Sequence, residues 1–407
     1  MSYYPILILL ALSCYLPAQQ TVTPTFDIIT VEFEVWDTPY LLRSEILDTT
    51  RQDYEPYMTG NYLSFSGYAR EATRVMEEEI GAKGMDTARY QRFRDEFRPI
   101  SAIASILEDA EQHEIVIVNE AHHEPRHRVF TRQLLQGLYD RGYRHFGMET
   151  LAPNAGTDSL DDRSVYPALK AGFYTRDPQF AALVAEAQRI GYHTFGYEAI
   201  GADGPKLREI GQMENIMRYR SDHPNGKLLL HVGYSHALEG ELGGAWEKAM
   251  AQRLADTTGL DPLTIDQTTF REMSDTTQER YEYRHFVPTQ TSLFVNEEGE
   301  QFNFDNEVRW FDHYVFHPRT NYLHGRPDYV FAFGQQPVAV AFDHIDTEGP
   351  WLVRAYAIDD EMAKAVPRDV VEMDVGSETA LALLPGEYRL LATSADGEQR
   401  VATVRVK

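Results

Sequence analysis

Short apolar runs alternate with amphipathic stretches between about residues 100 and 240, and this alternation restricts the fold more than any other feature of the chain. Short apolar runs are typical of buried strands, and apolar residues at helical spacing are typical of helices packed on a sheet. The expected strands cover 115–118, 145–148, 194–197 and 227–232, and the expected helices cover 100–112, 129–141, 180–190 and 206–219. Strands that alternate with helices form βαβ units with parallel strands. The sequence therefore predicts an α/β fold with a mostly parallel sheet flanked by helices.

One segment of this region is repeated. Residues 142–149 read GYRHFGME, and residues 191–198 read GYHTFGYE. In both copies we expect a helix to end at Gly-Tyr, a strand to follow, and a glutamate to close the strand. Two similar turns that arose by chance would give the same pattern. Under either interpretation, Glu149 and Glu198 are expected at the same level of the sheet.

The C-terminal part of the chain has a different pattern. Apolar and polar residues alternate in 338–342, 351–356, 388–392 and 401–406, with turn residues at Pro385-Gly386 and Asp396-Gly397. This pattern predicts antiparallel strands joined by tight turns. We therefore assign residues 19–330 to the α/β domain with an N-terminal extension. Residues 335–407 are assigned to a small antiparallel, β-sandwich-like module without chemistry of its own.

Charge and the N-terminal segment restrict where the protein acts. The formal net charge of −25 makes nucleic acid a poor partner. The apolar run 6–12, followed by Pro-Ala-Gln at 17–19, predicts a signal peptide over residues 1–18 and export to the periplasm or the extracellular space. This run is too short to span a bilayer, and we expect no transmembrane segment. Cys14 is the only cysteine, and lipidation there is a less favoured alternative because Ala11 fits a lipobox poorly.

Ionisable residues follow each of the four expected strands. Glu120 and His123 follow the first strand, with Arg126 and His127 in the next helix, which starts at Glu124-Pro125. The later strands are followed or closed by Glu149, Glu198 and the pair His231 and His236. Ligands of open parallel sheets bind at the carboxyl ends of the strands. A buried carboxylate is costly unless it is paired, so its repetition favours one shared pocket. Taken singly, the glutamates could be helix caps, His231 a hydrogen-bonded core residue and His127 a solvated one.

The same residues resemble the motifs of the erythromycin esterase/ChaN-like superfamily. Residues 119–123 with His127 resemble its Gly-Glu-x-x-His motif, with Asn119 in the place of the usual glycine. Residues 147–149 resemble its strand-end glutamate, and residues 232–236 resemble its Gly-x-x-His motif. Arg208-Glu209 is similar to the helix before the third motif in the erythromycin esterase branch. The resemblance covers about residues 100–245 and extends distantly to Tiki/TraB-like proteases.

This resemblance implies a secreted hydrolase of an ester or amide bond in a small-molecule or peptide substrate. His123 would be the general base on a water molecule, oriented by Glu149 or Glu120, and His236 and Arg208 would stabilise the oxyanion. The remaining expected contacts to substrate or ligand are His127, Glu198, His231 and Arg126. A metal-dependent version, similar to the Tiki/TraB type, would place zinc, manganese or iron on Glu120, His123, Glu149 and His236.

Two functions of other classes remain open at the level of sequence. A ChaN-like surface protein would bind haem or iron without catalysis, with His127, His123 or His231 as ligands. An inactive scaffold would use its β module to dock a partner. The sequence does not distinguish a metal site from a metal-free one, and it does not name the substrate.

Overall fold

The computed structural model describes residues 19–33, 39–50, 55–151, 166–304, 308–342, 349–374 and 377–407. The expected signal peptide and Cys14 lie outside these ranges. Among the described helices, none combines the length and the apolar character that a bilayer crossing requires.

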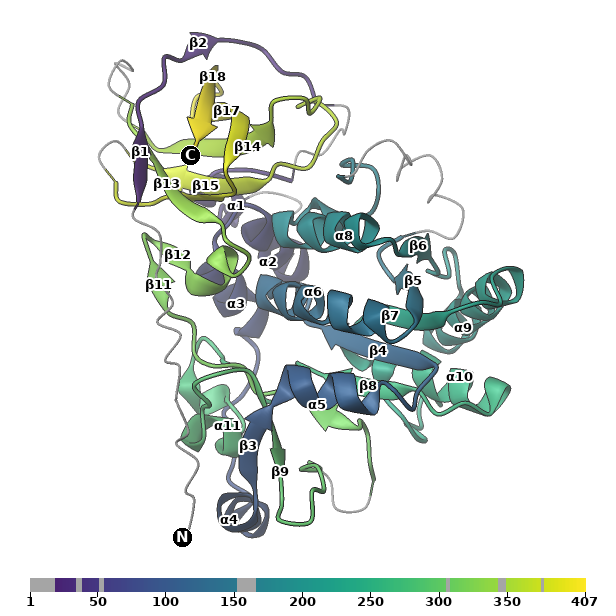
Figure 1. Ribbon diagram of the computed structural model, residues 1–407. Coiled ribbons are helices and arrows are strands. Elements are labelled where there is room, and N and C mark those ends of the chain that lie inside the picture. The colour runs from purple at the N-terminus through teal and green to yellow at the C-terminus, as the bar shows by residue number, and fades with distance from the viewer. Residues whose placement is uncertain are drawn as a thin grey trace, which may run out of the picture.

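A six-stranded parallel sheet forms the centre of the molecule (Figure 1). Its strand order is β10-β8-β4-β7-β5-β6, and every neighbouring pair is parallel. The strands are β4 (Ile115–Glu120), β5 (Tyr143–Met148), β6 (His193–Gly196), β7 (Lys227–Gly233), β8 (Leu263–Asp266) and β10 (His313–Tyr314). The predicted α/β fold class, with a mostly parallel sheet, is confirmed.

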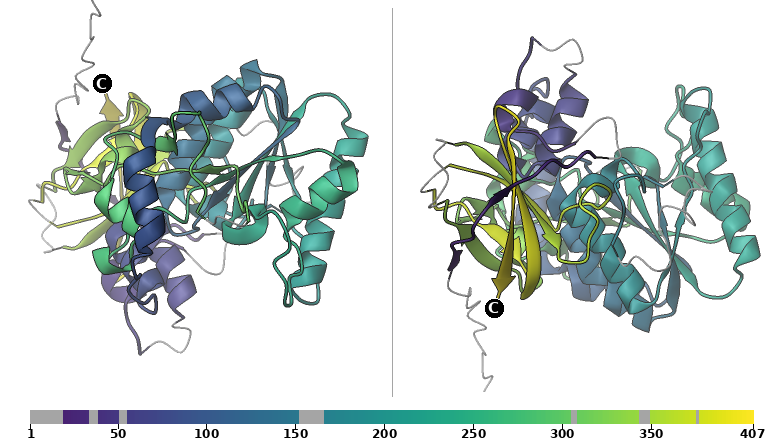
Figure 2. Two further views of the ribbon diagram at one scale, coloured as in Figure 1. Left: turned by 90° about the horizontal axis from the view of Figure 1, so that it is seen from below. Right: turned by 90° about the horizontal axis from the view of Figure 1, so that it is seen from above.

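Helices cover both faces of this sheet (Figure 2). One face packs against α5 (Ala102–Asp109), α6 (Pro125–Asp140) and α8 (Pro178–Ile190), and the other against α9 (Pro205–Asp222), α10 (Met250–Thr258) and Phe93 of α4 (Thr87–Glu96). Val116 and Val118 of β4 face the first layer, whereas Ile115 and Ile117 face the second. Because both faces are buried, the strand reads as a continuous apolar run in the sequence.

The repeated segment forms two adjacent strands. Helix α6 is followed by Gly142 with φ 93°, and α8 ends at Gly191 with φ 116°, a conformation that glycine adopts without strain. The strands that follow, β5 and β6, pair in parallel with Met148 opposite Gly196. Glu149 and Glu198 therefore lie just past the ends of two neighbouring strands.

Strands β8 and β10 were not predicted, and they extend the sheet beyond β4. Both are short, and Asp266 closes β8 with a carboxylate that accepts bonds from Asn119 and from the following turn. A second unpredicted pair is formed by β3 (Arg98–Ser101) and β9 (Ser292–Val295), which are antiparallel. Residues 260–304 and 308–330 thus complete the α/β part through short strands that lack a repeating apolar pattern.

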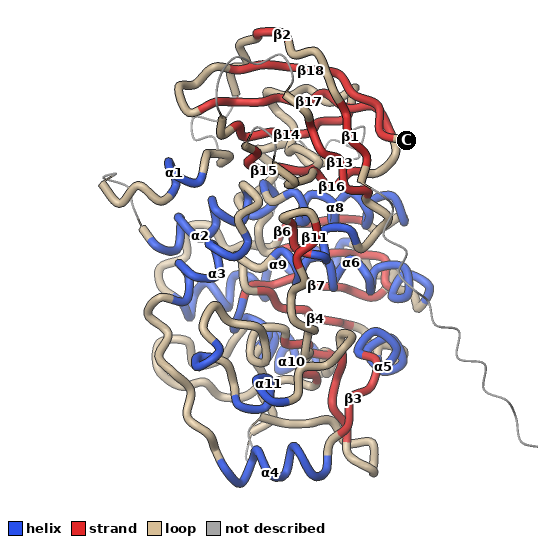
Figure 3. Tube along the Cα trace, turned by 90° about the vertical axis from the view of Figure 1, so that its left-hand side faces the viewer, coloured by secondary structure: helices blue, strands red, loops and turns tan. Residues whose placement is uncertain are grey.

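Two sheets share a core around Trp351 and form the C-terminal module (Figure 3). One sheet has the order β1-β13-β16 and the other β15-β14-β17-β18-β2. Their strands are β1 (Gln20–Val22), β2 (Asp27–Ile28), β13 (Gln336–Val340), β14 (Trp351–Ala357), β15 (Asp369–Met373), β16 (Leu381–Leu383), β17 (Gly386–Ser394) and β18 (Gln399–Val406). The N-terminal strands β1 and β2 therefore belong to this module, although the sequence placed them with the α/β domain.

The module packs directly on the α/β part. Leu352 and Val370 share an apolar core with Phe65 of α2 (Pro56–Phe65) and Ala181 of α8. The remaining described helices and short strands are α1 (Arg43–Ile46), α3 (Ala69–Glu77), α11 (Tyr281–His285), β11 (Tyr322–Leu323) and β12 (Arg326–Pro327), with 3₁₀ turns at Tyr174–Arg176, Tyr234–Ala237, Thr276–Gln278 and Asp328–Phe331.

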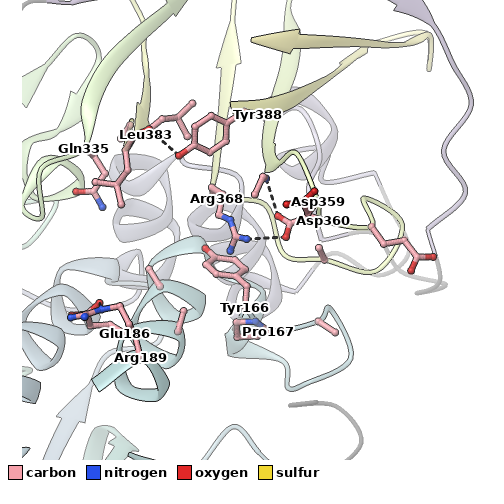
Figure 4. A pocket seen from close by; sticks show the side chains of 18 of the residues that line it. Tyr166, Pro167, Glu186, Arg189, Gln335, Asp359, Asp360, Arg368, Leu383 and Tyr388 are labelled. Carbon is pink, nitrogen blue, oxygen red and sulfur yellow. Dashed lines mark hydrogen bonds and ion pairs between the residues drawn. The ribbon is translucent and has the colours of Figure 1, made fainter. Parts of the chain in front are cut away.

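A cavity of about 1030 Å³ lies at the boundary between the two parts (Figure 4). Tyr166 and Glu186 line it from the α/β part, and Arg368 and Tyr388 line it from the module. The Arg368 guanidinium lies over the Tyr166 ring, 3.3 Å from its centroid, and donates a hydrogen bond to Asp360 at 2.8 Å. Arg368 of the module therefore contacts Tyr166 of the α/β part directly across the boundary.

Truncation of a leucine on the central sheet tests how much the packing against α9 and α10 contributes to the free energy of unfolding. Leu230 of β7 is fully buried, whereas Leu207 at the start of α9 is 52% exposed. We expect Leu230→Ala to lower the free energy of unfolding by about 2–5 kcal/mol. The control, Leu207→Ala, should change it by less than about 0.5 kcal/mol in the same urea titration. Equal losses in the two variants would contradict this packing.

Candidate functional site

Glu120 ends the central strand β4 and is 1% exposed. Arg128, one turn into α6, binds both of its oxygens at 2.7 and 2.9 Å. His231 Nε2 lies 2.8 Å and His122 Nδ1 lies 2.9 Å from the same carboxylate. Burial alone would raise the pKa of Glu120, but Arg128 and His231 hold it well below its usual range. Glu120 is therefore a buried, ionised carboxylate with fixed partners.

His122 is the imidazole that Glu120 orients. Because an ionised carboxylate only accepts hydrogen bonds, Nδ1 of His122 carries the proton and donates a hydrogen bond to Glu120. The ring stacks on Tyr174 with centroids 3.8 Å apart, and Tyr234 meets it edge-on at 5.1 Å. A Cβ at Gly233 would lie 2.4 Å from His122 Nε2 and 3.1 Å from a Glu149 oxygen. Nε2 thus lies directly above Gly233, beside Glu149, and only glycine leaves room for it.

Arg208 gathers the other strand-end groups. Its Nη2 donates to Glu149 at 2.5 Å and to Glu198 at 2.6 Å, and its Nε donates to Glu198 at 3.0 Å. Its Nη1 donates to His236 Nε2 at 2.8 Å. Glu149 also accepts the Gly233 N–H at 2.5 Å. Although burial would raise the pKa of Glu149, His236, His122 and Arg208 lower it to about 2.

His236 is held from its other side by Glu209, which is fully buried. The His236 Nδ1 lies 2.7 and 3.0 Å from the two Glu209 oxygens, and its Nε2 lies 3.4 Å from Glu149. Burial lowers the pKa of His236, but the carboxylates of Glu149 and Glu209 outweigh it, so the net shift is upward. When His236 is neutral, its Nε2 accepts a hydrogen bond from Arg208. When the ring is protonated, each of its nitrogens faces a carboxylate, Glu209 at Nδ1 and Glu149 at Nε2.

His123 lies away from these groups. Its Nδ1 lies 3.3 Å from the Tyr234 hydroxyl, and its Nε2 lies 3.7 Å from Glu124. Burial, with Arg271 nearby, holds the pKa of His123 well below its usual range. The structure therefore differs from the expectation that His123 would meet Glu120, because adjacent residues of the turn point to opposite sides. His123, Glu124 and Glu77 instead form a group whose geometry suits a metal ion.

The remaining residues expected to contact a ligand mostly support the backbone. The His127 Nδ1 accepts the Ala121 N–H at 2.9 Å. Arg126 donates to the Pro318 carbonyl and to Thr320. His231, which is 2% exposed, lies between Glu120 and Thr131, as a core histidine would. Glu198 is the most open to solvent of this group, with 22% of its side chain exposed.

Solvent reaches the site beside Arg208, whose side chain is 36% exposed. Tyr57 of α2 is also 36% exposed, its ring centroid lies 6.5 Å from that of His122, and its hydroxyl is hydrogen-bonded to that of Tyr174. Burial raises the pKa of Tyr57, so its hydroxyl keeps its proton at neutral pH. Arg208 and Tyr57 are thus partly exposed hydrogen-bonding groups near His122 and Glu149.

Several residues of the site were not predicted as site residues. His122 was passed over for His123, and Glu209 was noted only as the neighbour of Arg208. Arg128 lies in the first turn of the helix that follows Glu120. The helix start at Pro125 could have indicated that its side chain lies close to this carboxylate. Tyr57 and Tyr174 come from segments with no pattern that points to the sheet, so no sequence signal could have identified them.

No family model matches the chain, and no curated protein matches it significantly. Among solved structures, the type III effector HopBA1 is similar at 14% identity over 50% of this chain and 92% of that one, with a TM-score of 0.31. A succinoglycan biosynthesis protein is similar at 9% identity over 60% of this chain and 99% of that one, with a TM-score of 0.41. RRSP, a MARTX toxin effector domain from Vibrio vulnificus CMCP6, is similar at 14% identity over 52% of this chain and 43% of that one, with a TM-score of 0.31. At these TM-scores the likenesses carry no conclusion about function.

The pH dependence of the free energy of unfolding at acidic pH tests the pairing of Glu149. Because its pKa falls from 4.5 to about 2 on folding, the stabilisation is fully present above pH 4.5 and is lost as the pH falls towards 2. This contribution is on the order of 3 kcal/mol. We expect Glu149→Gln to lose stability less steeply than the parent protein between these pH values in urea unfolding. Identical slopes for the two proteins would show that Glu149 is not paired as described.

Proposed function

We propose that the protein is a hydrolase of an ester or amide bond that uses the paired Glu120 and His122 to activate water. The observation that carries this proposal is the orientation of His122. Its Nδ1 proton is committed to a buried carboxylate, while Nε2 is directed to the side of the ring where Glu149 and Arg208 lie. A carboxylate that fixes the tautomer of a histidine and stabilises its protonated form is a recurring arrangement in hydrolytic sites.

In the proposed reaction, His122 Nε2 removes a proton from a water molecule as the water oxygen attacks the substrate carbonyl. Glu120 remains ionised and stabilises the imidazolium that forms. Arg208 uses four of its five N–H groups in the bonds given above, so one Nη1 hydrogen is left over to stabilise the developing oxyanion. The Tyr57 hydroxyl is the second candidate donor. Collapse of the tetrahedral species then returns the proton to the leaving oxygen or nitrogen.

The haem- or iron-binding alternative has less support. Its expected ligands His127, His123 and His231 are each about 2% exposed. Ring nitrogens of His127 and His231 already bind Ala121 and Glu120. A haem would have to disrupt these contacts to reach either imidazole. We further propose export of the chain through residues 1–18, with small molecules or peptides met outside the cytoplasm as substrates.

Alanine variants of the two adjacent histidines test the assignment of the base. A general base contributes about 10²–10⁴-fold to turnover, so His122→Ala should lower single-turnover hydrolysis by that factor. His123→Ala, which removes no contact to Glu120, should retain turnover within about tenfold. The assay uses whichever ester or peptide of a broad panel the parent protein cleaves. Loss of activity in His123→Ala with normal activity in His122→Ala would restore His123 as the base, and full activity in both would exclude a base in this turn.

A further inference from the structure

Three side chains that can bind a metal ion meet at the turn after β4, next to His122 in the sequence. Glu77 ends α3, and His123 and Glu124 lie in the turn between β4 and α6. One ligand atom from each lies within 4.8 Å of the other two. Glu77 is fully buried, and 18% of the Glu124 side chain is exposed. Two carboxylates and an imidazole are thus brought together by segments more than forty residues apart.

His123 supplies an independent sign that a ligand belongs here. Its side chain is 2% exposed, and its Nε2 has no hydrogen-bond partner within the described part of the chain. This nitrogen lies 3.7 Å from Glu124, too far for a hydrogen bond, and it belongs to one of the three residues of the cluster. Buried polar atoms in native proteins nearly always have a hydrogen-bond partner or a ligand. An unpartnered imidazole nitrogen beside two carboxylates therefore points to a bound cation.

The surroundings of the cluster hold its members in place. Thr73 donates to Glu124 at 3.1 Å, and the Ser274 N–H donates to Glu77 at 2.7 Å. The Tyr234 hydroxyl lies 3.3 Å from His123 Nδ1 and can accept a hydrogen bond from the Nδ1–H group, which leaves the lone pair of Nε2 for an ion. Outer contacts of this kind fix the tautomer and the orientation of metal ligands. A cavity of about 570 Å³, lined in part by Glu124, provides the path from solvent.

We propose that Glu77, His123 and Glu124 bind one divalent transition-metal ion. One imidazole and two carboxylates suit zinc or manganese, and water from the cavity would complete the coordination. Arg271 is the present counter-charge, because it is hydrogen-bonded to Glu77 and lies 3.3 Å from Glu124. Its side chain also lines the cavity, so it can withdraw into that space when an ion takes its place. Arg271 and the ion therefore compete for the same two carboxylates.

The ion would link α3 to the turn that carries His122. Because His122 and His123 are consecutive, fixing His123 also fixes the backbone of the candidate base. The metal is then a positioning element rather than a participant at the scissile bond. This inference does not depend on the proposed hydrolysis, since it rests on residues that do not touch Glu120, Glu149 or Arg208.

Metal titration of the full chain tests the site without an activity assay. The metal-free protein is titrated with Zn²⁺ in competition with a chromogenic chelator, and Co²⁺ is used to record ligand-field absorption. We expect one equivalent to bind, with affinity lowered about 10–100-fold or more in His123→Asn and in Glu124→Gln. Glu272→Gln is the matched control, because Glu272 lines the same cavity outside the cluster and undergoes the same charge change. That variant should keep the affinity within about twofold.

Arg271→Gln provides the sharpest outcome, because removal of the competing guanidinium should tighten Zn²⁺ binding by about tenfold or more. Glu77 is fully buried, so Glu77→Gln is used only if circular dichroism shows that it folds. The proposal is overturned if no stoichiometric ion binds, or if His123→Asn and Glu124→Gln bind as tightly as the parent. It is also overturned if Arg271→Gln weakens binding. A normal metal titration with no hydrolysis of any substrate would instead count against the proposed function alone.

Discussion

The ionised carboxylate of Glu120, buried at the end of the central strand, is the constraint on which the rest of the site depends. A charge at this depth is stable only with partners, and Arg128, His231 and His122 supply four hydrogen-bonding contacts to its two oxygens. Each partner comes from a different part of the α/β unit: the helix after β4, the strand β7 beside it, and the turn between β4 and that helix. Satisfying one charge therefore fixes the relative positions of three elements.

A second charged group, Glu149 with Arg208, is connected to Glu120 through His122. His122 leans from Glu120 across Gly233 towards Glu149, and Arg208 then ties Glu149 to Glu198 and His236. Glu120 and Glu149 thus lie on the two sides of one imidazole, each with its own arginine. Arg128 is fully buried, whereas Arg208 is partly exposed. Arg128 is therefore part of a buried ion pair beneath the site, whereas Arg208 is a donor open to solvent.

The sequence predicted the parallel sheet, the strand-end glutamates and their repetition, because each follows from apolar periodicity and from the position of a residue relative to a strand. It favoured His123 over His122 as the base, but the direction of each side chain depends on the dihedral angles of one turn, which no sequence pattern determines. Strands β1 and β2 have three and two residues, too few to show a period, so their place in the C-terminal module could not be predicted. Tyr57 reaches the site only through the packing of α2.

The tautomer of His122 shows whether Glu120 orients this ring. In ¹⁵N NMR of the imidazole rings at neutral pH, with assignment by His122→Gln, we expect His122 to carry its proton on Nδ1. Glu120→Gln should abolish this preference, because an amide no longer demands a donor from the ring. An Nε2-protonated His122 in the parent protein, or a tautomer unaffected by Glu120→Gln, would contradict the claim that the buried carboxylate prepares this histidine as a base.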